Sequence, residues 1–78
     1  MKFTLGQLSL GMESGEIVRW LVEDGARVEA GQVVVEIETD KATAEVEAPA
    51  SGILMIAADE GETLDVGGLL AEIDEGSS

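Results

Sequence analysis

The chain has 78 residues, no cysteine, no histidine, and a formal net charge of −13 from 17 acidic and 4 basic residues. A chain this short supports one hydrophobic core, so we expect a single small domain. The composition excludes disulfides and thiolate metal sites, removes histidine as a general base or metal ligand, and argues against binding to nucleic acid or anionic lipid.

Short segments rich in valine, isoleucine and leucine are separated by glycine-containing turns, a pattern typical of an all-β sandwich or barrel. No apolar run approaches the roughly 20 residues of a membrane-spanning helix, so we expect no membrane contact. In chain order, the predicted strands are Phe3–Leu8, Glu16–Leu21, Arg27–Val28, Gln32–Glu38, Thr43–Ala48, Gly52–Ala57, Thr63–Leu64 and Leu69–Ile73. The strands at 27–28 and 63–64 are only short pieces.

Alternation within two of these strands indicates one buried face and one solvated face. Val33, Val35 and Ile37 are expected on the buried face of the strand that ends at Glu38. Apolar and acidic residues alternate in the same way from 44 to 48. Trp20 is expected to cover part of the small core.

A shift of 36 positions aligns Ile17–Glu38 with Ile53–Asp74 without a gap. The two isoleucines that open these segments are identical, and the turn glycines at 25 and 61, and at 31 and 67, fall in register. Short β segments can resemble one another by chance, but two turn glycines in register favour a true repeat. We therefore predict two similar halves that bury their apolar faces against each other.

Lys41 is the only basic residue that follows Arg27. It falls in the connection Thr39–Ala42 between two predicted strands, which makes a β-hairpin with the lysine exposed at its tip. Asp40 suits this turn because its short side chain can accept hydrogen bonds from nearby backbone amides. The lysine is then either an ordinary surface cation, a catalytic amine, or a group presented to a modifying enzyme. Catalysis is disfavoured, because it needs burial or a neighbouring cation, whereas the surrounding residues are acidic.

The stretch Glu38-Thr39-Asp40-Lys41-Ala42, which follows a valine run and precedes Pro-Ala-Ser-Gly, resembles the lipoyl domain of 2-oxo acid dehydrogenase complexes. The segment Leu10–Gln32 resembles the N-terminal half of that domain, so the resemblance covers nearly the whole chain. It implies a flattened barrel or sandwich of two four-stranded antiparallel sheets with quasi-two-fold symmetry. It also implies a non-catalytic carrier whose lipoate is joined by an amide bond to Lys41 and shuttles acyl groups and electrons.

The partners implied by the resemblance are the thiamine-diphosphate-dependent decarboxylase (E1), the acyltransferase core (E2) and dihydrolipoyl dehydrogenase (E3). A lipoate ligase, or an octanoyltransferase with lipoyl synthase, would modify the lysine. The loop Leu8–Gly15 is expected beside the lipoyl turn. The candidate recognition residues are Glu38, Thr39, Asp40, Ala42, Leu10 and Gly11.

Four other functions remain as alternatives. A biotinyl carrier domain has nearly the same fold, but its usual motif places methionine on both sides of the lysine, where this chain has Asp40 and Ala42. The lipoate-carrying protein of glycine cleavage is a longer chain. Paired carboxylates such as Glu36 and Glu38 suit a hydrolase or metal enzyme as well as a solvated strand face, and an unmodified interaction domain is the last alternative.

The predicted domain spans residues 1–75, and 76–78 are expected to begin a linker or to form an added tail. The N-terminal segment lacks the apolar core and cleavage site of a secretion signal. The chain is therefore expected to be a mature protein or a domain of a longer one, in the bacterial cytoplasm rather than the mitochondrial matrix.

Overall fold

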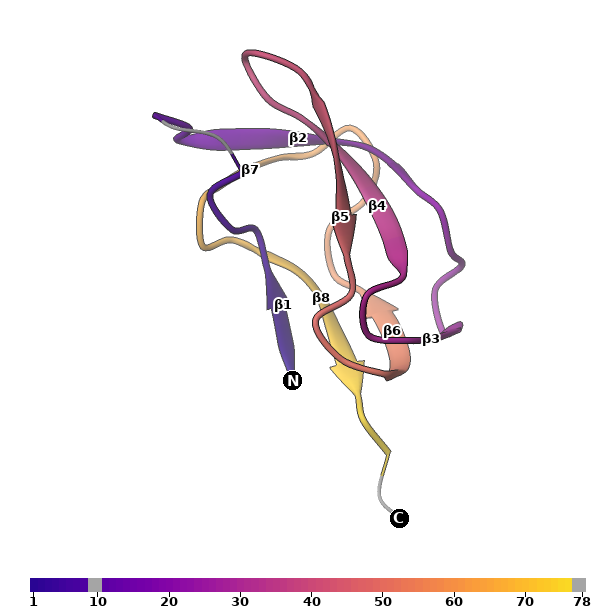
Figure 1. Ribbon diagram of the computed structural model, residues 1–78. Coiled ribbons are helices and arrows are strands. Elements are labelled where there is room, and N and C mark those ends of the chain that lie inside the picture. The colour runs from indigo at the N-terminus through magenta and orange to yellow at the C-terminus, as the bar shows by residue number, and fades with distance from the viewer. Residues whose placement is uncertain (9–10, 77–78) are drawn as a thin grey trace.

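The computed structural model describes residues 1–8 and 11–76, which form two four-stranded antiparallel sheets (Figure 1). One sheet has the strand order β1-β8-β6-β3 and the other has the order β5-β4-β2-β7. The eight strands of the described residues are β1 (Lys2–Thr4), β2 (Ser14–Trp20), β3 (Arg27–Val28), β4 (Val33–Glu38), β5 (Thr43–Glu47), β6 (Gly52–Ile56), β7 (Thr63–Asp65) and β8 (Leu69–Asp74).

Each predicted strand is present, and the all-β prediction is confirmed. The largest difference is β1, which ends at Thr4 rather than Leu8, because Leu5 already donates its backbone N–H to the Gly68 carbonyl outside the ladder (2.8 Å). The two sheets do not close into a barrel, so the architecture is a sandwich. All eight strands lie within the predicted domain, residues 1–75. The boundary between this domain and the predicted linker or tail, residues 76–78, stays a prediction.

The two sheets repeat one arrangement, which confirms the two predicted halves. If β2 is exchanged with β6, β3 with β7, β4 with β8 and β5 with β1, the order of one sheet becomes the order of the other. Connecting hydrogen bonds repeat as well: Gly31 N–H donates to Ala48 O (3.0 Å), and Gly67 N–H donates to Leu5 O (2.7 Å). Both glycines have positive φ, +88° and +95°, which other residues adopt only with strain.

At its start, the repeat in the sequence is offset by one residue from the repeat in the structure. In β2 a bulge lies between Ile17 and Arg19, so Val18 is an extra residue that β6 lacks. Ile17 therefore corresponds in space to Leu54, and both side chains are fully buried, whereas Ile53 is 37% exposed. The identity of the isoleucines at 17 and 53 is thus a coincidence of the ungapped alignment, since β-bulges place two residues opposite one.

A second register shift changes which residues of β4 are buried. The pairing of β4 with β5 is irregular between Val33 and Val35. Val34 and Val35 are both fully buried, whereas Val33 is only half-buried. The prediction was therefore correct for Val35 and Ile37 and partly correct for Val33, and it did not include the buried Val34. On β5 the predicted alternation holds, because its acids are exposed and its apolar residues are at least half-buried.

The core lies between the sheets and draws apolar side chains from both halves. Trp20 is half-buried and packs against it, which confirms its predicted covering role. Its indole N–H donates to Ala58 O (2.9 Å), and its ring meets Phe3 edge to face at 6.5 Å between centroids. The buried apolar residues are Phe3, Leu5, Met12, Ile17, Val28, Val34, Val35, Ile37, Ala48, Leu54, Ala58, Leu70, Ala71 and Ile73.

Among the described residues, no helix is long and apolar enough to cross a membrane.

Candidate functional site

Strands β4 and β5 form a hairpin whose turn carries Lys41 at its tip. The ladder pairs Ile37 with Ala44 and Glu38 with Thr43, after which the chain leaves the sheet for four residues. Ile37 is fully buried and anchors the hairpin in the core, whereas the Lys41 side chain is exposed. Figure 1 shows this turn projecting beyond the rest of the sandwich, above the β4 and β5 labels. The exposed tip predicted for the lysine is therefore present.

The hydroxyl of Thr39 holds this turn together. Thr39 Oγ1 donates to the carbonyl oxygen of Ala42 (2.8 Å) and accepts hydrogen bonds from the backbone N–H groups of Ala42 (3.2 Å) and Lys41 (3.3 Å). The backbone N–H of Thr39 also donates to Ala42 O (2.9 Å). Neither Asp40 nor Lys41 has positive φ, so the turn is not of the primed types that usually close two-residue hairpins.

The predicted capping role of Asp40 is wrong. Within the described residues, its carboxylate accepts no hydrogen bond from the turn, and the amides that it was expected to bind are taken by Thr39. Threonine hydroxyls make such local turns by the same chemistry as aspartate, although more weakly. Asp40 is exposed, and its charge is thus free to face a partner.

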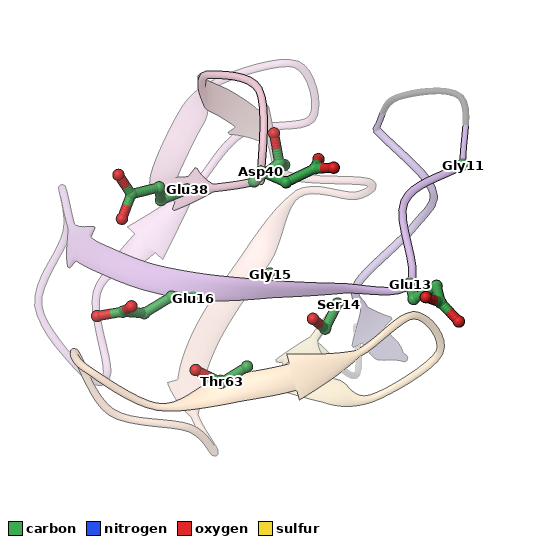
Figure 2. Close-up of a pocket in the computed structure, with 9 residues that line it drawn as sticks. Gly11, Glu13, Ser14, Gly15, Glu16, Glu38, Asp40 and Thr63 are labelled. Atoms are coloured by element: carbon green, nitrogen blue, oxygen red, sulfur yellow. The ribbon is translucent and has the colours of Figure 1, made fainter.

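An open depression of about 360 Å³ lies beside the Lys41 turn. Figure 2 shows Glu38 and Asp40 above it, Ser14 and Glu16 on β2, Glu13 just before that strand, and Thr63 on β7 at its far side. The four carboxylates make the depression strongly acidic. In the described part of the chain, no group of three or more acidic side chains is arranged to hold a metal ion.

Gly15 explains how β2 comes so close to the hairpin. A Cβ atom at this buried position would lie 2.6 Å from Cγ2 of Ile37, so only glycine lets the two strands pack at this separation. The pairing places Glu16 of β2 directly opposite Glu38 of β4. Like charges opposite one another destabilise a sheet, which makes this pair a feature without a structural benefit.

The structure brings most of the predicted site residues together around the turn. Glu38, Asp40, Lys41 and Ala42 are exposed there, Thr39 is half-buried, and Gly11 lines the acidic depression. The candidate Leu10 lies outside the described residues. Of the loop Leu8–Gly15 that was expected beside the turn, the described residues Gly11, Glu13, Ser14 and Gly15 line the depression. The sequence analysis missed Glu16 and Thr63, which reach the depression through the long-range pairing of β2 with β4 and β7.

The biotin/lipoyl family model, described as "Biotin-requiring enzyme", matches residues 1–73. The solution structure of the lipoyl domain of the 2-oxoglutarate dehydrogenase complex from Azotobacter vinelandii superposes with a TM-score of 0.77. The two sequences are 31% identical, and the match covers 99% of each chain. The chain belongs to the lipoyl-domain family. This membership confirms the predicted fold class, and it confirms a carrier domain rather than an intrinsic enzyme.

Curated relatives place similar lipoyl domains within longer proteins. The acetyltransferase component of the acetoin cleaving system of Pseudomonas putida is 41% identical over 96% of this chain and 20% of its own length. The protein X component of the mitochondrial pyruvate dehydrogenase complex of Chaetomium thermophilum is 45% identical over 94% of this chain and 17% of its own. The succinyltransferase component of the 2-oxoglutarate dehydrogenase complex of Staphylococcus saprophyticus is 39% identical over 91% of this chain and 17% of its own length.

The lipoyl domain therefore spans about a fifth of the length of these relatives. Two of the three are named as dihydrolipoyllysine-residue acyltransferases, and none is named as a biotin protein. The relatives favour the lipoyl assignment over the biotinyl alternative. Membership in the family implies lipoate joined covalently to a lysine.

Proposed function

We propose that this lipoyl domain carries lipoate on Lys41 and shuttles acyl groups and electrons within a 2-oxo acid dehydrogenase complex. The observation that supports the proposal most directly is the exposed amine at the tip of a turn whose backbone is fixed by Thr39. Such a turn offers the amine to a ligase without obstruction and holds the attachment point rigidly.

Composition narrows the choice of lysine to two, because Lys2 and Lys41 are the only lysines of the chain. Lys2 lies within β1, paired with Glu72 of β8, so its backbone is part of a ladder rather than a projecting turn. Modification of Lys41 would remove one positive charge and change the formal net charge from −13 to −14. We therefore assign the attachment to Lys41.

The residues around Lys41 fit a long covalent arm. The turn projects into solvent, and the acidic depression beside it is open, so an arm on Nζ has room to sweep in several directions. When bound, lipoate supplies a dithiolane that accepts an acyl group as it is reduced and later yields that group to a thiol acceptor. The missing cysteines and histidines are consistent with a protein whose redox sulfurs belong to its cofactor.

We propose that the domain belongs to an acyltransferase (E2) chain and visits E1, the E2 core and E3 in turn. The names of the curated relatives support this assignment. Tethering by a flexible linker raises the effective concentration of the domain near each active site. Attachment requires either a lipoate ligase or an octanoyltransferase with lipoyl synthase.

The recognition surface that we propose consists of the turn and the acidic depression. Glu16 and Glu38 face each other across β2 and β4 at a cost in stability, which a cationic partner would relieve. Acidic surfaces also speed encounters with basic active-site mouths. The proposed contacts are Glu38, Thr39, Asp40, Ala42 and Gly11, together with Leu10.

Intact mass measurement tests the attachment. Co-expression with a lipoate ligase should raise the mass of the domain by one lipoyl group, and Lys41→Arg should abolish the gain. The matched control Lys2→Arg should keep it. An unchanged mass on a folded domain, or loss of the gain in Lys2→Arg alone, contradicts the proposal, and a biotin-sized gain selects the biotinyl alternative.

We also propose the bacterial cytoplasm rather than the mitochondrial matrix as the compartment. The bacterial sources of two relatives support this choice, although a third is mitochondrial. Fractionation of cells that express the full-length protein tests it, and recovery with the matrix fraction contradicts it.

A further inference from the structure

A second depression of about 480 Å³ lies at the C-terminal ends of β2 and β6, beside the turns that lead to β3 and β7. We call it the tryptophan groove. It shares no lining residue with the acidic depression beside Lys41. Its floor is apolar and its rim is acidic: Trp20, Val22 and Ile56 form the floor, and Glu23, Asp24, Asp59 and Glu60 form the rim.

The floor is rigid. Its three side chains are half-buried and pack against the core on their inner side. The Trp20 indole is further fixed by its hydrogen bond to Ala58 O and by its edge-to-face contact with Phe3. A fixed aromatic ring that remains partly exposed is a favourable surface for the guanidinium or the alkyl stem of a cationic side chain.

Two rim carboxylates are held in place by the backbone of the floor. Glu60 Oε2 accepts a hydrogen bond from Trp20 N–H (2.9 Å), and Asp24 Oδ1 accepts one from Ile56 N–H (2.8 Å). The two contacts are equivalent under the quasi-two-fold relation of the halves. Within the described residues, the second oxygen of each carboxylate accepts no hydrogen bond. Each therefore presents a fixed acceptor at the edge of the groove.

The remaining rim acids, Glu23 and Asp59, are exposed. In the part of the chain that the structure describes, neither carboxylate is paired with a cation, and the one ion pair joins Arg19 to Glu36. Four rim carboxylates are thus gathered around an apolar floor without a compensating positive charge. Groups arranged in this way attract cations that also offer apolar surface.

We propose that the tryptophan groove binds a basic segment of a partner protein in which apolar residues alternate with arginine or lysine. Its apolar side chains and alkyl stems cover Trp20, Val22 and Ile56, and its charges reach the rim carboxylates. A second copy of this chain does not suit the groove, because each copy carries a net charge of −13. Nucleic acid and anionic lipid are repelled for the same reason.

Fluorescence titration of the unmodified domain tests this inference, and it does not depend on lipoate or Lys41. Trp20 is the only tryptophan, so its emission reports occupation of the groove directly. The probe is an end-blocked peptide of alternating leucine and arginine. A peptide of alternating glycine and arginine has the same charge but no apolar side chains. We expect a saturable change with the first peptide and weaker binding with the second.

Charge-matched variants separate a specific groove from general acidity. Glu23→Gln with Asp59→Asn removes two rim charges and disturbs none of the hydrogen bonds described above. Glu45→Gln with Glu47→Gln removes two charges from exposed positions on β5. The first pair should weaken binding of the leucine–arginine peptide roughly threefold to tenfold, since an exposed ion pair contributes little individually. The second pair should leave the affinity nearly unchanged.

Three results would overturn the inference. They are equal weakening by both pairs, equally tight binding of the glycine–arginine peptide, and the absence of a saturable change in Trp20 emission. None of them bears on the attachment of lipoate to Lys41.

Discussion

Replacing Thr39 by valine removes a single hydroxyl from the Lys41 turn and keeps a side chain of the same shape. Three hydrogen bonds are lost, at 2.8, 3.2 and 3.3 Å. A typical intramolecular hydrogen bond contributes about 0.5–1.5 kcal/mol net of water. The two longer bonds are near the limit of good geometry, so we count each as half a bond. Together the three count as two bonds, so the expected loss of stability is about 1–3 kcal/mol.

For a domain of this size, 1 kcal/mol corresponds to a change of about 4–8 °C in Tm. If the turn unfolds with the rest of the sandwich, Thr39→Val should lower Tm by about 4–24 °C in a circular dichroism melt. The backbone amides of Lys41 and Ala42 lose their acceptor, so their hydrogen exchange measured by NMR should also accelerate. Looser presentation of Lys41 should slow lipoylation by a ligase, and Thr39→Ser should retain most of the wild-type rate.

Thr43→Val is the matched control. Thr43 is exposed on β5, and among the described residues its hydroxyl makes no hydrogen bond. If Thr39→Val and Thr43→Val have the same Tm, and the amides of Lys41 and Ala42 exchange at wild-type rates in both, then the hydroxyl of Thr39 does not hold the turn.

Two further predictions concern the sandwich itself. Gly52→Ala should destabilise the fold by at least about 2 kcal/mol in urea unfolding, because the added Cβ would clash with the backbone oxygen of Asp74. Gly6→Ala is the control, since a Cβ at Gly6 meets nothing within 4 Å, and equal stability of the two variants would contradict the argument. Trp20→Phe should cost about 1–2 kcal/mol, because it leaves Ala58 O without the indole donor. A thermal melt indistinguishable from wild type would show that this hydrogen bond contributes nothing.

Local pattern was sufficient to predict the elements and their pairing into halves. Alternation with period two and the turn glycines located all eight strands, because strands and tight turns depend on residues that are neighbours in sequence. The repeat then implied two equivalent halves, and the hairpin with Lys41 at its tip followed from its position between them. These are short-range features, and the structure confirms them.

Features that depend on irregular pairing were not predictable in the same way. The bulge that makes Val18 an extra residue, and the shift that buries Val34, arise from how two strands meet rather than from either strand alone. The choice of Thr39 over Asp40 as the turn cap depends on backbone angles that both residues allow. Glu16 and Thr63 enter the site only through the pairing of β2 with β4 and β7.

The symmetry of the sandwich also decides which side of the molecule is available for attachment. The quasi-two-fold counterpart of the Lys41 turn is the gap between β8 and β1, where the N-terminal amine donates to Ile73 O (2.9 Å). Figure 1 shows the N-terminus and the C-terminal end of β8 on the opposite side of the molecule from that turn. A fusion partner or a solid support joined through either end is therefore held on the far side, and Lys41 points outward. A circular permutant that bridges the two ends should keep the same orientation.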